Sequence, residues 1–523
     1  MDSKNSDAAA EHLELSSPSV EASQPLAGEV EYRVSRMTLL ALVLMSLSWG
    51  TCTLANVGPS STYSSAVAEL GGQPISSWIP NAALFPLIGL QPVWGSFADR
   101  YGKKWFIVAG GVVGILGNIV AATAKRTEAV IGGQALNGIG SSLLLLVIPA
   151  SMEVVPAKQR SFVQGGTGLV NGLMSIVGII TAGAFAQISI TGWRWVYYFN
   201  AVFFAISGSG TYLFYRPPPP MLMREREAGR SALKDVDFIG MLTLLFGVVG
   251  VVLALTWGGN VYPWNSAAVV ASLVVGVFFL AVFGAYGSNF GIKNGILDHR
   301  FFESRNFPIV ASVAFIDGML LYGVNSFLPI KVSGVFTDNA MTVNLYLLPL
   351  NLLVLVGIAV SSYVLGVTKH YRTILIPSVF LLALFCGLLA LVTPSRKVLL
   401  LVFTALIGFG VGVTTVIPVV VMSYSVPSHL LGTAGTMFAS CRALGGTIGI
   451  TIFTAIYSKA QSGVATGDKA STAKSFQFVW VANAVIGVSA GLLTLFLQPV
   501  SHQMTAHVES ALESGKVRDG QGA

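Results

Sequence analysis

A run of charged residues and glycines, Gly95-Ser-Phe-Ala-Asp-Arg-Tyr-Gly-Lys-Lys104, offers the first candidate chemistry in this chain. It holds one acid, three bases and two glycines, in a short gap between apolar segments at about 75–94 and 105–124. A carboxylate at a helix end is attracted to nearby bases and to the positive N-terminus of another helix. We expect a tight charged loop that latches one conformation, although a plain basic anchor also explains the two lysines. The residues of this predicted latch are Gly95, Asp99, Arg100, Gly102, Lys103 and Lys104.

Two charged residues stand well inside apolar segments. Asp317 lies in Phe315-Ile-Asp-Gly-Met-Leu-Leu-Tyr322, and Arg442 lies in the segment at about 432–457. A charge at the centre of a bilayer costs about 2.5–3.5 kcal/mol on insertion scales, so such residues are rare and usually functional. A carboxyl group in apolar surroundings takes up a proton more readily than one in water. We expect Asp317 to bind protons, with Arg442 as its partner or facing an anionic substrate group. A permanent structural ion pair is the alternative.

Amide and aromatic side chains in other apolar segments are candidates for contact with a small molecule. Each one alone is more often a contact between helices, so both roles stay open. The candidates are Gln134, Asn137, Asn171, Tyr322 and Asn325.

The composition of the chain indicates that these candidate residues lie on membrane helices. Of 523 residues, 53% are hydrophobic and 10% are charged, and the mean hydropathy is +0.72. Soluble chains carry about 25% charged residues. Apolar runs of about 20 residues are long enough to cross a bilayer as helices. We therefore predict an all-α polytopic membrane protein with about fourteen transmembrane helices. The predicted segments are 36–56, 75–94, 105–124, 129–151, 162–187, 195–215, 238–257, 266–287, 308–330, 341–365, 374–393, 398–422, 432–457 and 478–498.

Loop charges predict the orientation of these helices. With the N-terminus in the cytoplasm, the inner loops carry about 15 bases against 9 in the outer loops, as the positive-inside rule requires. Aromatic residues such as Trp193, Trp257 and Trp264 gather at the outer ends. The net charge of +7 therefore reflects membrane topology, and no nucleic-acid partner is expected. The expected partners are the bilayer, protons and a small-molecule substrate, for a monomer in the plasma membrane or the vacuolar membrane.

The loops also divide the chain. The longest charged inner loop opens with Pro217-Pro-Pro-Pro220 and is expected to be a stiff connector. The predicted divisions are a disordered cytoplasmic tail (1–35), a six-helix bundle (36–215), a linker (216–237), two extra helices (238–287), a cytoplasmic loop (288–307), a second six-helix bundle (308–498) and a cytoplasmic tail (499–523).

An internal repeat supports two related bundles. Gly168-Leu-Val-Asn-Gly-Leu-Met-Ser-Ile-Val-Gly178 and Gly435-Thr-Met-Phe-Ala-Ser-Cys-Arg-Ala-Leu-Gly445 place glycines at similar offsets in the fifth helix of each. Weak symmetry between halves is typical of alternating-access transporters. A chance likeness of glycine-rich membrane helices is the alternative.

The sequence lacks the residue patterns of metal-binding proteins, ATP-driven pumps and hydrolytic enzymes. The three cysteines lie in apolar segments, and no histidine is paired with a second ligand at metal spacing. No Gly-Lys-Ser/Thr nucleotide loop and no Ser/His/Asp set occurs. We expect no enzyme and no cofactor other than a proton gradient.

The first charged run resembles the Gly-x-x-x-Asp-Arg-x-Gly-Arg/Lys-Lys signature of the major facilitator superfamily, between its second and third helices. Gly133-Gln-Ala-Leu-Asn-Gly-Ile-Gly140 is similar to the fourth-helix motif of its drug:proton antiporters. Trp193-Arg-Trp-Val-Tyr-Tyr-Phe-Asn200 resembles the start of the sixth helix in the fourteen-helix branch. Trp257-Gly-Gly-Asn-Val-Tyr-Pro-Trp-Asn265 and Ser440-Cys-Arg-Ala-Leu-Gly-Gly446 are similar to fungal trichothecene efflux pump-like transporters.

The resemblance implies two bundles around a cavity and export of small, largely apolar compounds in exchange for protons. Gln134 replaces the usual arginine of the fourth-helix motif, and Ile179 stands where the fifth-helix motif has Gly-Pro. These departures place the expected proton coupling on Asp317. A proton-coupled importer of ferric siderophores is the alternative, and a non-transporting nutrient sensor is a third hypothesis.

Overall fold

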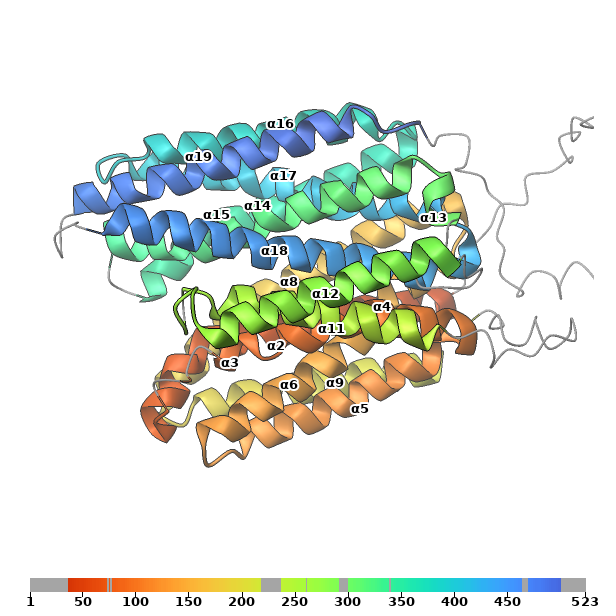
Figure 1. The fold of residues 1–523 in the computed structure, drawn as a ribbon, viewed down its shortest axis with the longest axis horizontal. Coiled ribbons are helices and arrows are strands. Elements are labelled where there is room, and N and C mark those ends of the chain that lie inside the picture. Colours follow the sequence, from red (N-terminus) through yellow and green to blue (C-terminus); the bar gives the residue numbers. More distant parts are fainter. Residues whose placement is uncertain are drawn as a thin grey trace, which may run out of the picture. The chain divides into compact units, whose positions relative to one another are not determined.

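The part of the chain that the structure describes is built from α-helices, as a computed structural model shows (Figure 1). The structure describes residues 36–72, 75, 78–217, 237–259, 261–290, 300–337, 340–462 and 469–499. Residues 1–35 and 500–523 of the predicted tails, 218–236 of the predicted linker and 291–299 of the predicted cytoplasmic loop lie outside these residues.

The first six apolar segments form helices that we call the N-terminal set. Their bounds are α2 (Arg36–Leu70), α3 (Trp78–Asn81), α4 (Leu84–Tyr101), α5 (Lys103–Ala122), α6 (Thr127–Leu144), α7 (Val147–Glu153), α8 (Arg160–Ile188) and α9 (Trp193–Phe214), with a 3-10 turn η2 (Ala157–Gln159).

An extra pair and a second set follow. The extra pair is α11 (Phe238–Trp257) and α12 (Ala267–Phe290), and the short α13 (Arg300–Glu303) comes next. The C-terminal set is α14 (Asn306–Val335), α15 (Ala340–Thr368), α16 (Arg372–Leu388), α17 (Lys397–Ser425), α18 (Leu431–Gln461) and α19 (Lys469–Thr494), with 3-10 turns η3 (Leu389–Leu391) and η4 (Ser428–Leu430).

Hydropathy explains why these segments are helical, because a chain in lipid must satisfy its backbone groups internally. Within the described residues, 12 helices are long and apolar enough to cross a membrane. The other two predicted segments correspond to α4, of 18 residues, and α9, of 22 residues. The all-α membrane fold is thus confirmed, while the number fourteen stays a prediction.

Small residues let neighbouring helices approach closely. Gly117 of α5 and Gly133 of α6 face each other, and a Cβ atom on Gly133 would lie 2.7 Å from the backbone nitrogen of Ala121. Such contacts hold helices together where the hydrophobic effect cannot.

The two sets are joined at the end where α4 stops and α5 begins, which we call the Asp99 end. There α4 packs on α18, and α8 packs on α15 and α17. One apolar core combines Met152 of the N-terminal set with many residues of the C-terminal set. Toward the other end the core divides into one cluster from each set. The conformation is therefore closed at the Asp99 end.

The extra pair packs against both sets. Helix α11 contacts α4 and α18 and lies beside α12 (Figure 1). Val248 and Val252 of α11 share a cluster with Ile88 of α4 and Ala443 of α18. Helix α11 therefore covers the line along which α4 and α18 meet.

Candidate functional site

The junction of α4 and α5 is tighter than the sequence predicts. Helix α4 continues to Tyr101, so most of the expected loop is helical and the prediction of a loop from Gly95 to Lys104 is wrong. The break is Gly102, which has φ of +93° and donates its N–H to the carbonyl of Ala98 at 2.9 Å. This backbone conformation favours glycine. Charged residues extend the helix here because the fold supplies them with partners.

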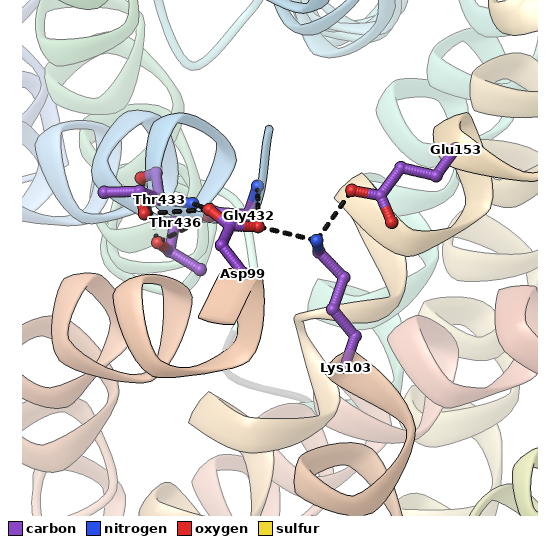
Figure 2. A network of polar contacts seen from close by, with 6 residues as sticks. All are labelled: Asp99, Lys103, Glu153, Gly432, Thr433 and Thr436. Carbon is purple, nitrogen blue, oxygen red and sulfur yellow. Dashed lines mark hydrogen bonds and ion pairs between the residues drawn. The ribbon is translucent and has the colours of Figure 1, made fainter. Parts of the chain in front are cut away.

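Asp99 binds the first turn of α18, across the interface between the two sets. Its carboxylate accepts hydrogen bonds from the backbone N–H of Gly432 at 2.9 Å and of Thr433 at 2.6 Å (Figure 2). It also accepts a bond from the Thr433 hydroxyl at 2.8 Å. The first N–H groups of a helix lack intrahelical partners, so Asp99 caps α18 as an N-cap side chain would, but from a different helix.

A chain of opposite charges holds Asp99 in place. Lys103 Nζ lies 2.6 Å from Asp99 and 2.6 Å from Glu153 at the end of α7 (Figure 2). These side chains are 3–13% exposed. Arg100 is buried in the same region, whereas Lys104 lies over the ring of Tyr212 at 5.5 Å. The structure brings Asp99 and Lys103 together at α18 and places Lys104 elsewhere.

Glycine is needed where α4 and α18 touch. A Cβ atom on Gly95 would lie 2.7 Å from the carbonyl oxygen of Gly432 and would collide with the hydroxyl of Thr436. A Cβ atom on Gly432 would collide with the Asp99 carboxylate. The cap by Asp99 therefore depends on the absence of side chains at both positions.

Asp317 and Arg442 form an ion pair between α14 and α18. Arg442 Nη2 lies 2.8 Å from Asp317 Oδ2, and the two side chains are 16% and 4% exposed respectively. Arg442 also donates to the hydroxyl of Thr415 at 3.2 Å. Within the described residues, Asp317 Oδ1 is buried without a hydrogen-bond partner. The structure thus unites the two deep charges that the sequence singled out, and leaves one carboxylate oxygen unsatisfied.

Two glycines bring the backbones of α14 and α18 into contact beside this pair. A Cβ atom on Gly318 would collide with the carbonyl of Arg442, and one on Gly445 would collide with the carbonyl of Phe315. The ion pair therefore lies in a closely packed contact between the two helices.

The predicted substrate residues fall into two groups. Gln134 and Asn137 are buried in a hydrogen-bonded chain inside the N-terminal set, in which Gln134 donates to the Tyr197 hydroxyl at 3.2 Å. Asn118 donates to Asn137 at 3.0 Å. This chain joins α5, α6 and α9.

The other three candidates are more accessible. Asn171 of α8 is half-buried and accepts a hydrogen bond from Thr53. Tyr322 is half-buried against Gly446, and Asn325 is exposed. The structure does not bring these residues together with Gln134 and Asn137.

Some site residues were not identified from the sequence. They are Glu153, which pairs with Lys103, and Thr433, which binds Asp99. The signal for Glu153 was the scarcity of acids near membrane segments, but Thr433 has no signal because its partner is 334 positions away. In the described ranges no group of three or more His, Cys, Asp or Glu side chains could hold a metal ion.

Comparison with known proteins agrees with this architecture. The family model described as "Major Facilitator Superfamily" matches residues 38–450. "Multidrug resistance protein 3" of Bacillus subtilis (strain 168) is 29% identical over 424 residues, covering 79% of this chain and 77% of that protein. "Efflux pump FUS6" of Gibberella moniliformis is 26% identical over 422 residues, covering 80% and 73%.

Solved structures share the fold at low identity. The proton:xylose symporter XylE matches with a TM-score of 0.65 and 12% identity, covering 90% of this chain and 99% of that one. The human organic anion transporter MFSD10 matches with a TM-score of 0.58 and 13% identity, covering 88% and 98%. From the family match and the multi-pass helical fold together, the chain is a membrane transporter that belongs to the major facilitator superfamily.

Proposed function

We propose that this protein exports a small, largely apolar compound in exchange for protons, by alternating access. The names of its relatives, a multidrug resistance protein and an efflux pump, support export. The observation that carries proton coupling is the buried ion pair of Asp317 and Arg442, because ionisable residues inside membrane segments are rare and form proton relays in transporters.

The contacts between the two sets support a state closed toward the cytoplasm. The excess of basic residues in the loops supports a cytoplasmic position for the Asp99 end. The cap by Asp99 and the shared apolar core close this end. In the exchange cycle, this is the state that has released its compound outward and takes up a proton.

An apolar layer supports the separation of the ion pair from the cytoplasm. Thr415, which accepts a hydrogen bond from Arg442, is followed on α17 by the buried stretch 416–422, which contains no polar side chain. Water and protons cross such a layer poorly, because polar and charged species lose their hydration there. A proton that reaches Asp317 in this state would come from the outer side.

Protonation of Asp317 is the proposed coupling step. A proton from the outer side binds the carboxylate, the charge on Asp317 disappears, and Arg442 keeps its hydrogen bond to Thr415 but loses its ionic partner. The contact between α14 and α18 is then weakened beside Gly318 and Gly445, and the Asp99 end can open. Deprotonation toward the cytoplasm restores the pair.

Asn171, Tyr322 and Asn325 are the proposed substrate contacts. These three residues are partly or fully exposed in this state. Gln134 and Asn137 would reach a substrate only after exchanging their present hydrogen bonds.

The experiment compares gradient-driven transport by wild-type protein and Asp317→Asn in cells that lack their own pumps. We expect the variant to insert normally and to lose the response to a pH gradient, because it removes the titrating carboxylate. Asp237→Asn is the matched control. Asp237 caps α11 through the N–H of Gly240 at 2.7 Å, and asparagine caps helices equally well. Undiminished gradient-driven transport by Asp317→Asn would rule out this residue as the coupling group.

The same cells test the direction and the substrate class. Resistance and accumulation are measured across toxins, drugs and ferric siderophores. Lower accumulation and higher resistance support export. Greater accumulation of a siderophore, with unchanged resistance to every toxin and drug, would establish import and contradict the proposal.

A further inference from the structure

A second polar contact crosses the interface between the two sets at the Asp99 end. Arg160, the first residue of α8, donates from Nη1 to the carbonyl of Ser423 at 2.9 Å, in the last turn of α17. Its guanidinium lies 5.7 Å from the ring centre of Tyr424. The Tyr424 hydroxyl donates in return to the carbonyl of Ala157 at 2.5 Å. Arg160 thus places a positive charge at the negative C-terminal end of α17.

Arg160 and Asp99 bind opposite sides of one short turn. Helix α17 ends at Ser425 and α18 begins at Leu431. Asp99 supplies a negative charge to the N-terminus of α18, and Arg160 supplies a positive charge to the C-terminus of α17. Each charge matches the helix end that it touches.

The two contacts are also linked within the N-terminal set. Asp99 pairs with Lys103, Lys103 pairs with Glu153, and Glu153 interacts electrostatically with Arg160. Charges of alternating sign therefore lie between the Asp99 contact and the Arg160 contact.

One turn beyond Arg160, α8 carries a fully buried polar side chain without a hydrogen-bond partner among the described residues. Gln164 has no exposed surface, and within the described residues neither its amide oxygen nor its amide nitrogen has a hydrogen-bond partner. The hydroxyl of Ser161 is also buried without a hydrogen-bond partner among these residues.

Gln164 lies on α8 next to residues that meet the C-terminal set. Residues three or four apart share one face of a helix, so Gln164 is flanked by Arg160, Ser161 and Gly168, and by Thr167, which faces Ser46 of α2. Ser161 accepts a hydrogen bond at its carbonyl from the Ser362 hydroxyl at 2.7 Å, and a Cβ atom on Gly168 would touch Ile358. Separation of α8 from α15 would let water reach the Gln164 amide.

We propose that Arg160 is a second latch residue and that Gln164 limits the stability of the closed state, so that the Asp99 end can reopen. Arg160 stabilises the closed state through a charge-assisted hydrogen bond. Gln164 destabilises the same state, because an unsatisfied buried amide loses its hydration without compensation. This inference rests on alternating access, but it depends neither on proton coupling nor on the direction of transport.

The test measures how often the closed end opens in the purified full-length protein, without substrate and without a gradient. The reporter is Ser362→Cys, buried at the interface between α8 and α15. The native cysteines Cys52, Cys386 and Cys441 are replaced by alanine. The rate of maleimide labelling at position 362 then reports the open fraction.

The two substitutions should shift this rate in opposite directions. Arg160→Gln should raise it about tenfold, and Gln164→Leu should lower it about tenfold, as expected for the loss of one charged hydrogen bond and of one unsatisfied amide. The double variant should lie near the parent rate. Arg160→Lys, which keeps the charge, should give a smaller increase than Arg160→Gln and tests the contact if the latter does not purify.

A matched control uses the same helix. Gln187 lies at the other end of α8 with its side chain exposed, so Gln187→Leu should leave the labelling rate unchanged. An unchanged rate in the Arg160 variants would refute the second latch. An unchanged or faster rate in Gln164→Leu would refute the role of the buried amide. Loss of proton coupling in Asp317→Asn would affect neither result, so the two proposals fail separately.

Discussion

Replacement of Asp99 by asparagine tests the reasoning about the closed state most directly. The carboxylate accepts three hydrogen bonds from the first turn of α18 and lies 2.6 Å from Lys103 Nζ. Asparagine keeps one acceptor oxygen, presents an NH₂ group to the remaining donors and carries no charge. A hydrogen bond to a charged group contributes about 1.5–3 kcal/mol. Loss of one such bond and of part of the ion pair should cost the closed state about 3 kcal/mol, roughly a hundredfold change in its ratio to the open state.

The assay follows the distance between spin labels on α4 and α18 at the Asp99 end, together with substrate binding and transport. We expect Asp99→Asn to show a large population with a longer distance, slower transport and retained substrate binding. The control is Lys104→Gln, which also removes a charge, but from a side chain that lies on Tyr212. A distance distribution in Asp99→Asn that equals that of the wild type would refute the assignment of Asp99 as a latch. Lost binding at normal expression would point to a different role.

Three further substitutions test other contacts. Gly95→Ala should separate α4 from α18 and reduce transport. Its control is Gly132→Ala, which should transport normally because an added Cβ atom there meets nothing within 4 Å. Equal transport by the two variants would contradict the close approach of α4 and α18 at Gly95. Glu69→Gln should weaken the ion pair with Arg194, at 2.9 Å, and lower thermal stability by only about 1 kcal/mol because the pair is partly hydrated; a loss of several times that amount would show a larger role. Lys331→Met should leave thermal stability unchanged or raise it. This fully buried ammonium has a carbonyl as its hydrogen-bond acceptor, and replacement of buried charges by apolar groups is often neutral or stabilising. A marked fall in melting temperature would show that the charge itself is needed.

The helical architecture was predictable because bilayer thickness fixes the length of an apolar segment. The boundaries were less so. Helix α2 extends to Leu70, beyond the predicted limit at 56, and α4 extends through Asp99 to Tyr101. Hydropathy ends a segment at the first charged residues, whereas a helix continues wherever the fold gives those residues partners.

The candidate site was predictable as a set of residues but not as a set of contacts. The cost of burying a charge identified Asp317 and Arg442, but it did not decide whether they pair with each other. The backbone N–H groups that bind Asp99 carry no sequence signature, because every helix has them. The role proposed for Gln164 is invisible in the sequence for the same reason, since it depends on what the opposite helix lacks.

The position of the extra helix pair makes the molecule asymmetric toward the bilayer. Helix α11 shields the α4–α18 contact through Val248 and Val252, whereas the exposed side chains of Leu173 and Tyr363 flank the α8–α15 contact. A fatty acyl chain, or an apolar compound dissolved in one leaflet, therefore meets a barrier of extra protein on one flank. On the other flank it meets the helices that must themselves separate when the transporter opens.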